Sequence, residues 1–68
     1  MQVSYDGLWQ LLIARDINKT ELITLINMGS ATLAKLSKNE IVSLGVLMRI
    51  CEKFNCELGD ICCFVKEK

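Results

Sequence analysis

The sequence contains no histidine, and this absence removes two kinds of chemistry. Histidine is the usual general base near neutral pH and the commonest metal ligand in proteins. The chain also has no convergent group of carboxylates and no glycine-rich phosphate loop to which catalysis could be assigned. The sequence therefore predicts a protein that is not an enzyme, with no cofactor, no metal site and no evident small-molecule ligand.

An excess of charge of one sign is absent as well. Eight Lys and Arg residues balance eight Asp and Glu residues, which gives a net charge of zero and a pI near 6.1. Bulk charge therefore gives no reason to expect a polyanionic partner. A nucleic-acid partner has to be argued from local charge instead.

Long apolar runs are missing too. The longest apolar stretches, such as Leu11–Ala14 and Gly45–Met48, are far shorter than the roughly 18 to 20 residues that cross a bilayer. The first five residues carry no positive charge, which argues against a signal peptide. The sequence predicts a cytoplasmic protein without membrane contact.

The four cysteines lie in the last third of the chain, at Cys51, Cys56, Cys62 and Cys63. An even set would suggest disulfides in a small secreted domain, but a reducing cytoplasm keeps thiols free. Their spacing does not match the Cys-x-x-Cys pairs of structural zinc sites. We expect these side chains to pack as small, partly buried apolar groups.

The length of the chain, 68 residues, is enough for one domain, which we expect to span residues 1–68. A domain of this size buries only about 60% of the surface that its extended chain exposes. Because 51% of the residues are hydrophobic, some apolar surface is expected to stay uncovered. This surplus favours self-association.

The spacing of apolar residues predicts an all-α fold of five short helices with no strand. The helices are expected at about residues 5–15, 19–26, 30–36, 44–54 and 58–65. Asn18 and Glu21 can form a capping box, Ser43 can cap the fourth helix, and Asn27 and Asn55 can end helices because Asn tolerates positive φ. The expected inward residues are Leu8, Leu11, Leu12, Leu22, Ile23, Ile26, Leu33, Leu36, Leu44, Leu47, Ile50, Cys51, Phe54, Leu58, Ile61, Cys62 and Val65.

The second and third helices, at about residues 19–36, have the spacing of a helix-turn-helix. Only a short turn around Asn27 separates them. The outward side of the third helix carries small or polar residues, which lets a helix approach a major groove closely. Between Leu22 and Asn39 there are two lysines and no acid, so local charge favours DNA although the net charge does not.

Four segments in this order resemble a known family. They are L-W-x-L-L-I-x-R, T-E-L-I-x-x-I-N-M-G-S-A-T-L-A-K-L-S-K-N-E, S-L-x-x-L-x-x-I-C and N-C-E-L-G-D-I. The resemblance that includes them runs from about Tyr5 to Val65. The sequence resembles the Cro/repressor-like helix-turn-helix regulators, or XRE family, particularly the short single-domain members. The resemblance implies a five-helix lambda-repressor-like domain that binds double-stranded DNA without catalysis.

By position, the resemblance assigns three residues to DNA base edges: Ser30, Ala31 and Lys35. It assigns four residues to phosphates: Lys19, Thr32, Lys38 and Asn39. The chain departs from the family pattern at Ile23, where alanine is usual, and at Asn27, where the turn glycine is usual. Because the outward side also lacks long Gln, Asn or Arg side chains, we expect sequence specificity to be modest or to depend on DNA shape.

Two functions remain open at this point. The first is a sequence-specific transcriptional regulator that represses by occupying a two-fold operator as a homodimer, joined through the C-terminal helix at Cys63 and Phe64. The second is a protein-interaction module, adaptor-like or antitoxin-like, that has the same fold but little affinity for DNA. The zero net charge and the short side chains of the third helix motivate the second function.

Overall fold

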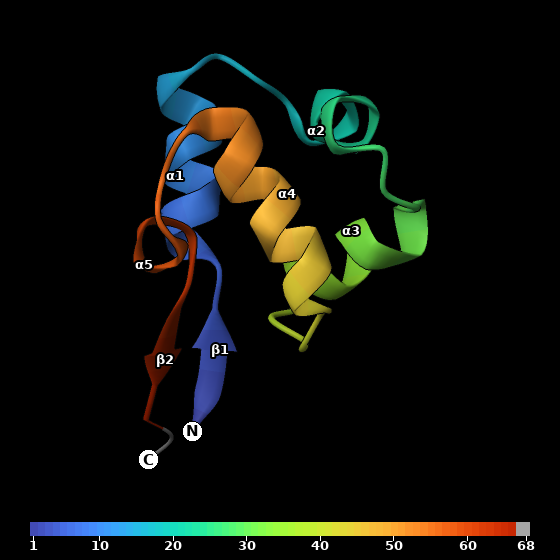
Figure 1. Ribbon diagram of the computed structural model, residues 1–68. Coiled ribbons are helices and arrows are strands. Elements are labelled where there is room, and N and C mark those ends of the chain that lie inside the picture. The colour runs from blue at the N-terminus through green and yellow to red at the C-terminus, as the bar shows by residue number, and fades with distance from the viewer. Residues whose placement is uncertain (67–68) are drawn as a thin grey trace.

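The computed structural model describes residues 1–66, which form five helices and one two-stranded sheet (Figure 1). The elements are β1 (Gln2–Ser4), α1 (Asp6–Ala14), α2 (Lys19–Ile26), α3 (Ser30–Ser37), α4 (Leu44–Phe54), α5 (Leu58–Ile61) and β2 (Cys63–Val65). Helix α4 crosses the middle of the molecule, with α1 and α5 on one side and α2 and α3 on the other (Figure 1). The prediction of five helices is confirmed. Within residues 1–66, no helix is both long and apolar enough to span a membrane.

The predicted helix caps are confirmed. Asn18 Oδ1 accepts a hydrogen bond from the Glu21 N–H at 2.8 Å, and the Glu21 carboxylate accepts one from the Asn18 N–H at 3.3 Å. Asn27 and Asn55 end α2 and α4 with φ values of 59° and 52°. Ser43 Oγ accepts a hydrogen bond from the first turn of α4. Side-chain hydrogen bonds therefore set the starts of α2 and α4, and the left-handed conformation of an asparagine sets their ends.

The core takes at least one residue from every helix, as the apolar spacing predicts. Its buried members are Tyr5, Leu8, Leu12, Leu22, Ile26, Met28, Leu36, Leu47, Ile50, Phe54 and Ile61. Three residues that were expected to face inward do not. Leu44, Leu58 and Val65 are 61%, 42% and 48% exposed.

The prediction that the chain contains no strand is wrong. β1 and β2 pair antiparallel, with Val3 opposite Phe64 and Ser4 opposite Cys63. Cys62, which ends α5, already has extended backbone angles, φ −146° and ψ 160°. The last helix is therefore four residues long, and Cys63 and Phe64 lie on a strand rather than on the expected helix. Because successive strand residues point to opposite faces, these two side chains do not share a face.

Helices α1 and α4 are held together at their C-terminal ends by Arg15. Its guanidinium Nη2 donates a hydrogen bond of 2.9 Å to the Phe54 carbonyl and lies 5.3 Å from the centre of the Phe54 ring. A cation at this place also interacts favourably with the carbonyl groups at the end of α4.

At the other end of α1, the backbone of α5 lies directly against Gly7. A Cβ at this position would overlap the Asp60 carbonyl oxygen. Glycine therefore permits an approach of the two helices that a residue with a side chain would prevent.

Tyr5 joins the start of α1 to the loop that follows α3. Its hydroxyl donates a hydrogen bond of 2.7 Å to the Glu40 carbonyl, and its backbone N–H donates one of 3.3 Å to Asn39 Oδ1. The Tyr5 side chain is 1% exposed, and burial raises its pKa above the ordinary value. This contact fixes the C-terminal end of α3 relative to the core.

The packing role predicted for the cysteines is confirmed at Cys51, Cys56 and Cys62, which pack half-buried against the core, while Cys63 is exposed. Burial raises the pKa of the Cys51 thiol, and the nearby Cys56 raises it further. Burial also raises the pKa of Cys62. These two thiols stay protonated at neutral pH and are weak nucleophiles.

Candidate nucleic-acid interface

The turn between α2 and α3 is short because Asn27 adopts a left-handed conformation. The next N–H, that of Met28, bonds back to the Ile23 carbonyl at 3.2 Å. Met28 is buried, whereas Ile23 is half-buried. The turn therefore stays short although Ile23 and Asn27 depart from the family pattern.

The outward side of α3 follows from which of its residues are buried. Leu36 is fully buried and Leu33 is half-buried. At about 100° per residue, the opposite side carries Ser30, Ala31, Ala34, Lys35 and Lys38, all of which are exposed. We call these five residues the recognition face. It consists of small side chains with two lysines towards its C-terminal end.

The N-terminus of α3 is capped by backbone geometry alone. Gly29, at φ −77° and ψ 158°, is the N-cap, and no side chain accepts a hydrogen bond there. The N–H groups of the first turn are therefore free of side-chain acceptors. Such a helix N-terminus attracts phosphate through these N–H groups and the helix dipole.

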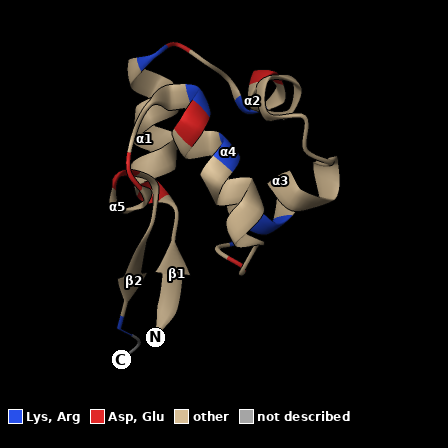
Figure 2. Cartoon of the chain, in the orientation of Figure 1, with Lys and Arg blue, Asp and Glu red and all other residues tan. Residues whose placement is uncertain are grey.

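Charge is distributed unevenly over the fold. Helix α3 carries the basic residue Lys35 and no acid, whereas α5 carries Asp60 and is preceded by Glu57 (Figure 2). The net charge of zero therefore combines a basic α3 with an acidic α5.

These features can be compared with known proteins. Residues 7–67 match the family of Cro/C1-type HTH DNA-binding domains. The chain belongs to this family. The fold of this Cro/C1-type domain is also similar to that in the crystal structure of transcriptional regulator VanUg, Form II, with a TM-score of 0.94 and 52% sequence identity, over 97% of this chain and 88% of that chain. No curated protein matches. The domain is a DNA-binding transcriptional regulator and not an enzyme, as the resemblance implies.

The residues predicted to contact phosphates have different surroundings in this Cro/C1-type domain. Lys38 is exposed at the C-cap of α3, and Thr32 is half-buried at the edge of that helix. Lys19 is exposed at the start of α2, with its Nζ 4.4 Å from the centre of the Trp9 ring. Asn39 is half-buried, with its side-chain oxygen occupied by Tyr5. Its amide N–H₂ is the part that can donate to a phosphate.

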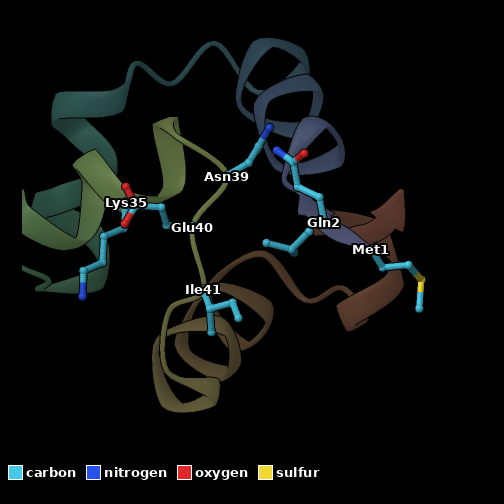
Figure 3. A pocket seen from close by; sticks show the side chains of 7 residues that line it. Met1, Gln2, Lys35, Asn39, Glu40 and Ile41 are labelled. Carbon is cyan, nitrogen blue, oxygen red and sulfur yellow. The ribbon is translucent and has the colours of Figure 1, made fainter. Parts of the chain in front are cut away.

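A hollow of about 460 Å³ lies beside the recognition face, between the loop after α3 and the N-terminal strand (Figure 3). Gln2 and Asn39 point toward each other across it, while the Lys35 side chain extends away from both (Figure 3). Glu40 also lines this hollow and is exposed. Sequence reasoning did not include Gln2 or Glu40 in the site, because only the tertiary fold brings residue 2 next to residue 39.

Proposed function

We propose that this regulator is a repressor that occupies a two-fold symmetric operator as a homodimer in the reducing cytoplasm, with one α3 helix in the major groove of each half-site. The recognition face carries the proposal, because its small side chains permit close approach of the helix backbone to base edges. A dimer bound over a promoter excludes polymerase from the same DNA. Regulation by occupancy needs no chemistry beyond binding.

Base reading is assigned to Ser30, Ala31 and Lys35. The Lys35 ammonium can donate to guanine O6 and N7, the Ser30 hydroxyl can donate or accept, and the Ala31 methyl can contact a thymine methyl. All three side chains are exposed on one side of α3. Two of them are too short to reach far, so we expect part of the specificity to come from DNA shape.

Phosphate contacts are assigned to Lys19, Thr32, Lys38 and Asn39, assisted by the free N–H groups at the start of α3. Lys38 is the C-terminal member of the recognition face, Thr32 lies on the same helix, Asn39 follows it, and Lys19 begins α2. Their role is to fix the orientation of α3 on the duplex rather than to read sequence.

A direct test begins by selecting bound sequences from a random duplex pool, which gives both the half-site and the half-site spacing. Titration of the selected duplex then compares the wild-type protein with the double variant Lys35→Ala, Lys38→Ala. We expect the loss of the base contact alone to weaken binding by about 10- to 100-fold per half-site. The slope of log affinity against log salt should also become shallower by about 0.9 for each phosphate contact removed.

The control is Lys53→Ala, which removes one positive charge from the last turn of α4, against two in the double variant. Its effect should be small and independent of DNA sequence. If the double variant binds the selected duplex as tightly as the Lys53→Ala variant does, the recognition face does not contact DNA as assigned.

A further inference from the structure

Five large apolar side chains are exposed on one part of the surface, in the loop before α4, on α4 itself, on α5 and on β2. They are Ile41 (84% exposed), Leu44 (61%), Met48 (54%), Leu58 (42%) and Phe64 (73%), and we call them the apolar face. Leu44 and Leu58 line two hollows of about 320 Å³ each, one shared with Met48 and the other with Ile41 and Phe64. The five residues are therefore contiguous rather than scattered.

This surface arises because α4 carries two apolar stripes. Leu47, Ile50 and Phe54 form the stripe that faces the core. Leu44 and Met48, one turn apart, form a second stripe beside it. Helix α5 has only four residues, and β2 then turns Phe64 outward, so neither element covers this second stripe.

We propose that the apolar face binds the same face of a second copy of the chain, with Phe64 of each protomer in the hollow beside Ile41 of the other. The five residues of the apolar face expose an accessible area of roughly 600 Å² per protomer. A standard interface buries about 800 Å² on each partner, and a little over half of that buried area is apolar. The area is therefore sufficient for a stable dimer.

The shape of the face also favours a second copy. A two-fold contact requires one patch that is complementary to itself. Here a projecting ring, Phe64, lies at the rim of a hollow whose lining is almost entirely apolar. No charged residue lines the hollow beside Ile41 and Phe64, whereas Glu52 and Glu57 line the hollow beside Met48. The contact is therefore centred on the uncharged hollow, with the two acids towards its edge.

The position of the face suits the operator contact, and in this respect the inference rests on the proposed function. Ile41 follows the last residue of α3 by four positions, so the contact begins close to the recognition helix. The chain extends 35 × 23 × 19 Å. The longest of these dimensions is close to one DNA turn, about 34 Å, which is the usual separation of two half-sites.

The experiment is sedimentation velocity from low to high micromolar concentration without DNA. We expect the wild-type chain to sediment as a dimer of twice 7.7 kDa, and Phe64→Lys and Ile41→Asp to sediment as monomers. Phe64→Ala should raise the dimer dissociation constant about 30-fold, as expected for an aromatic residue at the centre of an interface. Because Phe64 and Ile41 are mostly exposed, these variants should keep the wild-type circular dichroism spectrum.

Ile13→Lys is the matched control, because Ile13 is 79% exposed on α1, outside the apolar face. It should leave the dimer intact. A wild-type chain that remains monomeric at high micromolar concentration overturns the proposal, and so does an Ile13→Lys variant that dissociates as much as Phe64→Lys. A dimer that survives Phe64→Lys and Ile41→Asp overturns it too, because the contact then lies elsewhere.

These outcomes are separate from those of the DNA titration. If the chain is a monomer whose DNA binding still depends on Lys35 and Lys38, the proposed interface is wrong and the proposed recognition face stands. If the chain is a dimer whose DNA binding is unchanged by Lys35→Ala, Lys38→Ala, the proposed recognition face is wrong and the interface stands.

Discussion

Replacement of Gly7 by alanine tests how closely α1 and α5 approach. The added methyl group would overlap the Asp60 carbonyl oxygen and lie 3.0 Å from the Asp60 carbonyl carbon and 3.3 Å from Ile61 Cα. All three atoms belong to the backbone, so no side-chain rotation can make room. Because carbon atoms pack best at about 3.5 to 4.0 Å, the two helices have to move apart by about 1 Å.

The cost follows from two opposing effects. Overpacking costs about 1–3 kcal/mol, and about 2–3 kcal/mol where only backbone atoms are in the way, while alanine in a helix gains up to about 1 kcal/mol over glycine. We therefore expect Gly7→Ala to lower the free energy of unfolding by about 1–2 kcal/mol. For a chain of this size, the melting temperature should fall by about 4–16 °C.

The assay is urea and thermal unfolding followed by circular dichroism, with Gly59→Ala as the control. A Cβ at Gly59, within α5 itself, meets nothing within 4 Å. This variant should therefore gain up to about 1 kcal/mol. If Gly7→Ala is as stable as Gly59→Ala, α1 and α5 are not in the backbone contact described above.

Three further predictions concern single residues. Tyr5→Phe removes the hydroxyl bond to Glu40 and should cost about 1 kcal/mol in urea unfolding. Because burial raises the pKa of Tyr5, the unfolded chain loses the hydroxyl proton at a lower pH than the folded chain does. The free energy of unfolding should therefore fall as pH rises above about 10, and it should fall less steeply in Tyr5→Phe. Equal slopes of the free energy of unfolding against pH in the two proteins would contradict this. At Asn27, φ 59°, alanine should destabilise by about 1 kcal/mol and glycine should not; equal losses would show that positive φ is not the cause. Glu40→Gln removes an acid beside the recognition face and should tighten DNA binding about 3-fold at low salt. This gain in affinity should vanish at high salt, where charges are screened. A gain in affinity that persists at high salt would show that its cause is not electrostatic.

The helix ends were predictable from sequence because their causes are local. Asn18, Asn27 and Asn55 act on backbone groups within five residues of themselves. The strands were not predictable, because each has three residues and its partner lies about sixty residues away. A segment of three residues is too short to show the alternation of apolar and polar residues that indicates a strand.

The error at Leu44 and Leu58 has a different cause. Periodicity shows that α4 is amphipathic, but it does not show which of two adjacent apolar stripes meets the core. That choice depends on where α5 ends, which is a property of the whole fold.

Part of the candidate site was predictable from the sequence and part was not. Ser30, Ala31 and Lys35 could be placed on one exposed side because a single helix determines that side. The contacts of Lys19 with Trp9 and of Asn39 with Tyr5 could not be predicted, because each joins elements whose relative placement the sequence pattern does not specify.

The Lys19 contact has a practical consequence. Trp9 is the sole tryptophan of the chain, and the Lys19 ammonium lies 4.4 Å from its ring. A phosphate that binds Lys19 draws this charge toward the DNA and changes the electric field at the indole. We expect the intrinsic fluorescence of Trp9 to shift as an operator is bound, so the chain would carry an internal reporter of occupancy that needs no label.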